Sequence, residues 1–266
     1  MNQGQRRRFL IQVLLNERPE YQNTELPSEA EGQRQLLRGL MNLRAPQETD
    51  DEFLRIQDEY LQTETAAKGI TDIETLTPVQ PGLYLWQGDI TTLKCDAIVN
   101  AANSGMTGCY IPNHRCIDNA IHTFAGVELR AFCGEMMRRQ GHPEPTGQAK
   151  ITPAFNLPCR YVLHTVGPIV KGRVTKKDEA LLASCYDACL ALAEKQGLES
   201  VAFCCISTGE FHFPNELAAE IAVRAVKEFL TEQTSVKKVI FNVFKDEDKE
   251  IYTRLLGANG AAEKRA

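Results

Sequence analysis

Length, composition and charge limit the classes of protein to which this chain can belong. Its 266 residues are 43% hydrophobic, enough for one large domain with a full core and an accessory segment. A formal net charge of -5 gives no basic surface for duplex nucleic acid, and no stretch approaches the ~20 apolar residues of a membrane-spanning helix. Nine scattered cysteines, an odd number, argue against a disulfide framework. We therefore expect a cytoplasmic protein that binds neither nucleic acid nor membrane.

The N-terminal part of the chain has the pattern of helices. Arginines at 6–8 precede a short apolar run at 9–15 that no small-residue cleavage site follows, which favours an amphipathic helix over a secretion signal. Apolar side chains at 36–43 and again at 53–61 repeat at helical spacing. We expect these helices to pack on the main domain, and docking of a partner protein is the alternative.

From about residue 78, apolar runs typical of strands alternate with helical patterns. The expected strands lie at 83–86, 95–99, 161–166, 201–206 and 239–244. The expected helices lie at 117–139 with an interruption at Gly126, at 179–195, from about 215, and at 246–256. This order predicts an α/β fold, a three-layer α/β/α sandwich with a central mixed sheet, preceded by a helical N-terminal extension. The expected divisions are the extension at 1–75, the domain at 76–258 and a flexible tail at 259–266.

A loop at 108–116, which we call the Cys-His loop, carries candidate metal ligands. Cys109, His114 and Cys116 form a C-x4-H-x-C cluster, and Pro112 keeps the backbone between them out of a helix. Thiolates and imidazole suit Zn²⁺, and a set of three ligands leaves one position for water or substrate. The other interpretation is a buried core, in which cysteine acts as a small hydrophobe and histidine is hydrogen-bonded. We expect zinc as the cofactor.

Further polar residues adjoin this loop and the strand expected at 201–206. Asp118 and His122 are four residues apart, so they share one face near the start of the expected helix. Residues 207–214 lead from that strand into the next helix, and such a loop offers backbone N–H groups to a diphosphate without any basic residue. An ordinary turn between strand and helix is the alternative.

Several motifs follow one another along the chain. They are Gly88-Asp89-Ile90-Thr91, Asp96-Ala97-Ile98-Val99-Asn100-Ala101-Ala102-Asn103, Asp118-Asn119-Ala120-Ile121-His122 and Ser207-Thr208-Gly209-Glu210-Phe211. In order and spacing they resemble the macrodomain family, which binds ADP-ribose, over roughly residues 78 to 257. Where hydrolytic macrodomains usually carry a run of glycines, this chain has the Cys-His loop, which resembles the zinc-dependent branch of the family. Asn119 stands where the family usually has glycine.

The resemblance implies a set of residues that bind ADP-ribose. Asp89 corresponds to the acid that accepts a hydrogen bond from the adenine amino group, and Ile90 lies next to it in the pocket. Asn103 corresponds to the asparagine that holds the distal ribose. Phe244 is a candidate to pack on adenine, with a core position as the alternative. The diphosphate loop and the aromatic residue near the distal ribose correspond to Ser207, Thr208, Gly209, Glu210 and Phe211.

The implied activity is a zinc-dependent hydrolase that removes mono-ADP-ribose from an acidic side chain, Asp or Glu, of a protein substrate. Asn103 would orient the substrate, and Asp118 is the acid/base candidate, although Asn119 and the nearby zinc leave the general base open. Zinc would either polarise a substrate oxygen or lower the pKa of a bound water, and the sequence is consistent with both roles. The alternatives are a reader module that binds ADP-ribose without turnover, and a deacylase acting on O-acyl-ADP-ribose.

Overall fold

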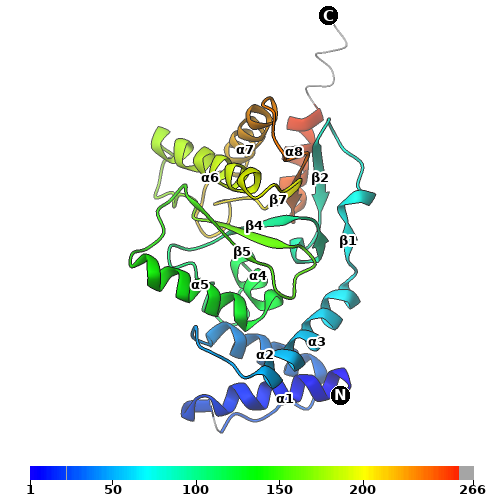
Figure 1. Cartoon of the computed structure of the whole chain (residues 1–266). Coiled ribbons are helices and arrows are strands. Elements are labelled where there is room, and N and C mark those ends of the chain that lie inside the picture. The colour runs from blue at the N-terminus through cyan, green and yellow to red at the C-terminus, as the bar shows by residue number, and fades with distance from the viewer. Residues whose placement is uncertain (22, 258–266) are drawn as a thin grey trace, which may run out of the picture.

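The N-terminal part of the chain forms a layer of helices that precedes the sheet. The computed structural model describes residues 1–21 and 23–257, so the tail expected at 259–266 lies outside the described residues. The helices of this layer, blue to cyan in Figure 1, are α1 at Gln3–Asn16, α2 at Ala30–Leu43 and α3 at Asp51–Lys68. We call α1, α2 and α3 the N-terminal helices.

The N-terminal helices share a hydrophobic core with the main domain. Leu10, Leu37 and Phe53, one from each helix, are almost fully buried in this core, and Val127 of the main domain joins them. The carboxylate of Asp50 accepts a hydrogen bond from the amide of Phe53 at 2.8 Å and so caps the first turn of α3. The apolar stripes of these helices are therefore used inside the molecule, in agreement with the expected packing on the main domain.

The centre of the main domain is a mixed sheet. In residues 1–21 and 23–257 this sheet has six strands in the order β2-β8-β7-β4-β6-β5, and every neighbouring pair is parallel except β5 with β6. The strands are β2 at Leu83–Gln87, β4 at Ala97–Ala101, β5 at Ala149–Pro153, β6 at Tyr161–Thr165, β7 at Ser200–Phe203 and β8 at Lys238–Val243. A separate short parallel pair is formed by β1 at Thr71–Asp72 and β3 at Leu93–Lys94.

Helices cover both faces of this sheet. They are α4 at Ile117–Ala125, α5 at Val127–Gln140, α6 at Lys176–Lys195, α7 at Asn215–Leu230 and α8 at Asp246–Gly257. Helix α6 packs on α7 and α7 on α8, whereas α4 and α5 lie between the sheet and the N-terminal helices (Figure 1). The predicted α/β/α sandwich with its helical extension is confirmed.

The structure differs from the expected elements at strand ends, at one sheet edge, at the start of α6, which begins at Lys176, and in the short β1–β3 pair, which was not predicted. Strand β7 ends at Phe203, so residues 204–206 leave the sheet earlier than the apolar run indicated. Strand β5 was not predicted because its sequence, Ala-Lys-Ile-Thr-Pro, lacks a strong apolar run; its proline is tolerated at a sheet edge. No helix in residues 1–21 and 23–257 is long and apolar enough to cross a membrane.

Candidate active site at the carboxyl edge of the sheet

The residues expected to bind ADP-ribose follow strands of the parallel part of the sheet. Asp89 lies just after β2, Asn103 just after β4, and Phe244 directly after β8. The segment 207–211 follows β7. Because β2, β8, β7 and β4 are parallel neighbours, their carboxyl ends meet at one edge, which is where open α/β sheets bind ligands.

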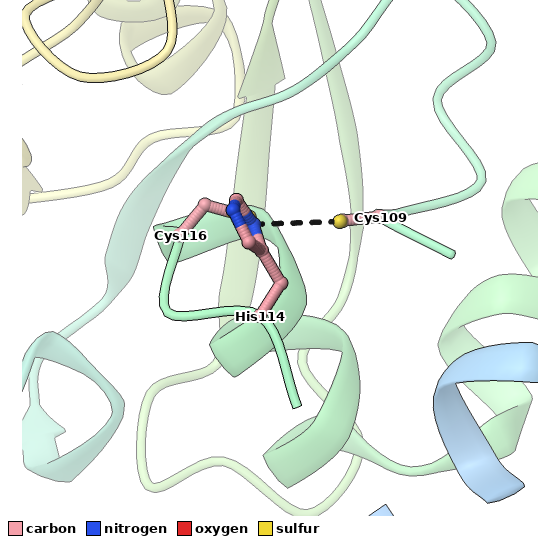
Figure 2. A group of neighbouring side chains, drawn as sticks. All are labelled: Cys109, His114 and Cys116. Atoms are coloured by element: carbon pink, nitrogen blue, oxygen red, sulfur yellow. Dashed lines mark hydrogen bonds between the residues drawn. The ribbon is translucent and has the colours of Figure 1, made fainter. Parts of the chain in front are cut away.

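The Cys-His loop brings its candidate ligands together. The ligand atoms of Cys109, His114 and Cys116 all lie within 4.8 Å of one another, and each side chain is partly exposed. Figure 2 shows the ring of His114 facing Cys109, whose Sγ is 3.7 Å from His114 Nδ1. Two sulfur donors and one imidazole nitrogen at this spacing fit zinc, with one coordination position left for water or substrate. The interpretation of these cysteines as core residues is not supported by their exposure.

Special backbone conformations shape this loop. Gly108 has a φ of 83°, and a Cβ at this position would lie 2.7 Å from Cγ of His122, so only glycine fits. Asn113 takes a φ of 56°, a left-handed conformation that asparagine tolerates. At the end of the loop, Sγ of Cys116 accepts a hydrogen bond from the amide of Asn119 at 3.4 Å and caps α4. Burial raises the pKa of Cys116 to about 12, so a metal ion would displace a proton on binding there.

Asp118 lies beside the Cys-His loop in a network of amides. Its side chain is 5% exposed; Oδ1 accepts from Nδ2 of Asn100 at 2.8 Å, and Oδ2 accepts from Nδ2 of Asn103 at 3.2 Å. Burial raises the pKa of Asp118 to about 6, although these hydrogen bonds and the charge of Arg130 act to lower it. The structure thus joins both catalytic candidates in one hydrogen-bonded group.

His122 is the other polar residue expected on this face of α4. Its Nε2 is 3.6 Å from Oδ1 of Asp118, and neither ring nitrogen has a hydrogen-bond partner within the described residues. Burial lowers the pKa of His122, so the ring is neutral. It also lies close to Cys133 and His164. Both nitrogens of His164 have partners, Asn100 Nδ2 at 3.1 Å and Thr152 Oγ1 at 3.0 Å, so His164 has no nitrogen free to bind a metal ion in this cluster.

At the adenine end of the expected site, Asp89 is held by two neighbours. Its Oδ1 accepts from the amide of Thr91 at 3.0 Å, and its Oδ2 pairs with Nζ of Lys68 from α3 at 2.9 Å. Burial acts to raise the pKa of Asp89, but these hydrogen bonds outweigh it and leave the pKa below the usual value. The side chain of Ile90 is buried, whereas Phe244 is 76% exposed and so is not a core residue.

The loop after β7, residues 204–214, has the properties expected for a diphosphate site. Ser207 is buried with a φ of 66°, and Gly167 packs against it so closely that a Cβ there would lie 2.0 Å from Ser207 Oγ. The amides of Gly209, Glu210 and Phe211 donate to no acceptor within the described residues. Oε1 of Glu210 is 3.6 Å from Nε2 of His114, so this loop adjoins the Cys-His loop.

Sequence reasoning missed the side chains that the N-terminal helices and α5 send to this site. Arg38 and Asn42 of α2 contact the Cys-His loop, Lys68 of α3 pairs with Asp89, and Arg130 of α5 donates to the carbonyl of Cys109. In the sequence, these polar residues lie beside the apolar stripes of amphipathic helices. Residues at such positions are usually solvated, so the sequence does not distinguish them from ordinary surface residues.

Comparisons with known proteins agree on one family. The family model described as Macro domain matches residues 99–222. A protein-ADP-ribose hydrolase of Treponema medium is 56% identical over 260 residues, covering 96% of this chain and 100% of that protein. One of Staphylococcus aureus (strain MRSA252) is 49% identical over 246 residues, covering 92% of each.

Solved structures give the same result. A Trypanosoma brucei macrodomain in complex with ADP-ribose superposes with a TM-score of 0.65 at 31% identity, over 82% of this chain and 95% of that one. An Oceanobacillus iheyensis macrodomain with ADP superposes with a TM-score of 0.63 at 35% identity, over 71% of this chain and 97% of that one.

Proposed function

This chain belongs to the Macro domain family, and we propose that it is a zinc-dependent hydrolase that removes mono-ADP-ribose from acidic side chains of proteins. It is an enzyme, a protein-ADP-ribose hydrolase like its close relatives. The zinc dependence and the acidic attachment site are our proposal. The division of the chain into an extension at 1–75 and a catalytic domain at 76–258 is also our proposal.

One observation carries the proposal: the Cys-His loop lies beside the Asp118 network, at the edge of the sheet where ligands bind. Cys109, His114 and Cys116 would hold the zinc ion. When bound, the ion would supply Lewis-acid stabilisation of negative charge that develops on an oxygen of the substrate or of water. A structural zinc site would normally be closed by a fourth protein ligand, whereas three donors come together in this loop of the described chain.

Other residues would bind and orient ADP-ribose. The ionised carboxylate of Asp89 would accept a hydrogen bond from the adenine amino group. The amides of Gly209, Glu210 and Phe211, which have no acceptor in the described part of the chain, would donate to the diphosphate, which needs no basic side chain for this contact. Asn103 would hold the distal ribose, because its side chain is already oriented by Asp118 and by the carbonyl of Gly108 at 3.1 Å.

Asp118 is the residue that we propose to hold and move a proton. With a pKa of about 6, its carboxyl is mostly ionised at neutral pH, yet it binds a proton more readily than an exposed aspartate does. Asn100 and Asn103 donate to both of its oxygens and so fix the carboxylate in one orientation. A fixed carboxylate of this kind can take a proton from an attacking water.

The test measures release of ADP-ribose from a protein that carries it on a carboxylate. Chelation, or Cys109→Ala, should lower the rate by about two orders of magnitude or more, because several kcal/mol of lost stabilisation are felt tenfold per ~1.4 kcal/mol. Calorimetry should find the affinity for free ADP-ribose much less changed. The matched control is Cys95→Ala. Cys95 lies just before β4, at the amino ends of the parallel strands, whereas the site lies at their carboxyl ends.

Metal analysis provides an independent measurement. The purified protein should carry about one zinc per chain, and Cys116→Ala should remove it. A metal-free protein that cleaves at the wild-type rate would refute the zinc dependence. A zinc-loaded protein that binds ADP-ribose and releases none from a carboxylate-linked protein would refute the substrate. Faster turnover of O-acyl-ADP-ribose would indicate the deacylase instead.

A further inference from the structure

The Cys-His loop has little hydrogen bonding of its own. In the described chain, one backbone hydrogen bond lies within residues 108–116: the amide of His114 donates to the carbonyl of Ile111 at 3.2 Å. A loop with so few internal bonds does not fix three ligand side chains by itself. Its conformation must come from outside contacts.

Arg38 of α2 supplies one of these contacts. Its Nη2 donates to the carbonyl of His114 at 3.0 Å and to Oδ1 of Asn119 at 2.8 Å, and its Nε donates to the same Oδ1 at 3.2 Å. The guanidinium therefore makes a forked contact with Asn119 while it holds the backbone of a candidate ligand. A planar fork with fixed donors suits such a bridge, which an ammonium group could not reproduce.

Asn42, one turn further along α2, supplies a second contact. Its Oδ1 accepts from the amide of Asn113 at 3.0 Å, and its Nδ2 donates to Oγ1 of Thr123 at 2.9 Å. The side chain is 1% exposed, so both bonds are shielded from water. Asn113 has the left-handed backbone conformation described above, and Asn42 satisfies its amide there. Between these two residues, α2 faces Pro112 and Asn113 at Gly39, where an added Cβ would be in ordinary van der Waals contact with both.

Asn119 and Arg130 connect these contacts to the main domain. The side-chain amide of Asn119 donates to the carbonyl of Ile111 at 3.0 Å, while its oxygen accepts from Arg38. Arg130 of α5 donates to the carbonyl of Cys109 at 3.2 Å and also to carbonyls at the end of α2, including that of Arg44 at 2.8 Å. The loop is thus held from several sides.

We propose that Arg38 and Asn42 are positioning residues of the active site, and that α2 serves to hold the Cys-His loop in the conformation that binds metal. This inference rests on the proposed function only in taking zinc as the ion. Loss of a side chain that orients a metal ligand typically lowers metal affinity by about 10- to 100-fold. Here the oriented groups are the backbone atoms of His114 and Asn113 rather than a ring nitrogen.

The first experiment compares zinc affinities by competition with a chromophoric chelator. Arg38→Gln and Asn42→Ala should each bind zinc about 10- to 100-fold more weakly than the wild type, the range found when a group that orients a ligand is lost. Arg38→Lys should recover only part of the loss, because an ammonium cannot make the forked contact. The control is Arg6→Gln, which breaks the pair with Glu59 within the N-terminal helices and should leave zinc affinity unchanged.

Cobalt(II) provides a readout of geometry. In the cobalt-loaded protein, Arg38→Gln and Asn42→Ala should alter the visible absorption bands, because these depend on how the ligands surround the ion. Arg6→Gln should leave the bands as they are in the wild type. A loss of general stability alone would not change the spectrum of the folded, loaded protein.

Hydrogen exchange of the metal-free protein separates this proposal from the zinc proposal. In the described loop, the amides of Asn113 and His114 are the two that donate hydrogen bonds. The amide of Asn113 should exchange faster in Asn42→Ala, and that of His114 in both variants, with protection of β4 unchanged. If the wild type binds no zinc but the loop loosens in this way, the zinc proposal fails and the positioning role stands. Unchanged loop exchange, or wild-type zinc affinity in both variants, would overturn the positioning role.

Discussion

Two neighbouring loops border the proposed active site, and they are held in opposite ways. The loop after β7, residues 204–214, is closed by its own backbone: the amide of Phe213 donates to the carbonyl of Ser207 at 3.0 Å, and that of His212 to Gly209 at 3.0 Å. The Cys-His loop is held by side chains from α2, α4 and α5. The first keeps amides free for a ligand, and the second presents side chains that could bind a metal.

This difference explains which parts of the function depend on distant parts of the chain. A loop closed by its own backbone needs little beyond the strand and helix at its ends. A loop held by side chains depends on residues far away in the sequence, such as Arg38, which is 76 residues from His114. We therefore expect binding of ADP-ribose to tolerate damage to α2 better than turnover does.

The largest effect should come from removing the carboxylate beside the Cys-His loop. Asp118→Ala should lower the rate of ADP-ribose release by about 10²- to 10⁴-fold, the range for loss of a general base. The affinity for free ADP-ribose should change far less, and Asn103→Ala should show the same split with a smaller rate effect. Asp187→Ala, at an exposed site on α6, is the control. Equal losses of rate and affinity would remove Asp118 from the proton-transfer role.

The next prediction tests how much the hydrogen bonds of Arg130 to the Cys-His loop and to the end of α2 contribute to stability. Arg130→Met should lower the free energy of unfolding by about 2–4 kcal/mol, because several buried carbonyls lose their donor. Arg160→Met removes a surface ion pair with Asp96 and should lower it by less than about 1 kcal/mol. Urea denaturation gives both values. A similar small loss for the two variants would mean that the Arg130 contacts are not a major support.

A smaller effect concerns the adenine end, away from the Cys-His loop. Asp89→Ala should weaken binding of ADP-ribose by about 1.5–3 kcal/mol, the value of a hydrogen bond to a charged group. Asp72→Ala is a close control, because Asp72 forms a similar ion pair, with Lys94 at 2.8 Å, in the short strand pair. Titration calorimetry that finds the same affinity in both variants would exclude Asp89 from the pocket.

The smallest effect concerns His164 of β6, which is fully buried and lies 3.1 Å from Nδ2 of Asn100. Burial lowers the pKa of His164 to about 3, so the unfolded chain binds a proton that the folded protein rejects, and stability falls as pH drops below about 6.5. Between pH 7.5 and 5.5 this group alone should remove about 1.4 kcal/mol. His164→Gln should flatten the pH dependence of the unfolding free energy by that amount, whereas the exposed His142→Gln should leave it unchanged. An equal slope in wild type and His164→Gln would contradict the assignment.

The fold was largely predictable because its signals are local. Apolar runs such as 239–244 identified the central strands, and Gly126 marked the break between α4 and α5. The grouping of Cys109, His114 and Cys116 was also predictable, since all three lie in one short loop. Strand β5 was not predicted because an edge strand needs little apolar sequence.

The support of the site was not predictable from local pattern. Arg38 and Asn42 look like ordinary polar residues of an amphipathic helix, and only the folded chain brings them to the Cys-His loop. Asn119 was noticed as a departure from the family pattern and left the general base in question. In the structure the side chain of Asn119 connects the Cys-His loop to α2, because it is hydrogen-bonded to both Ile111 and Arg38.

The bridging position of Asn119 also limits how this site could be moved between proteins. A designer who grafts residues 108–116 onto another protein of this fold would transfer the ligands without Asn119, and the loop would lack its acceptor for Arg38. A graft that adds Asn119 but no α2 would still leave the amide of Asn113 without Asn42. The transferable unit is therefore discontinuous: a loop, the first turn of the helix after it, and one face of a helix that begins some 80 residues earlier in the chain.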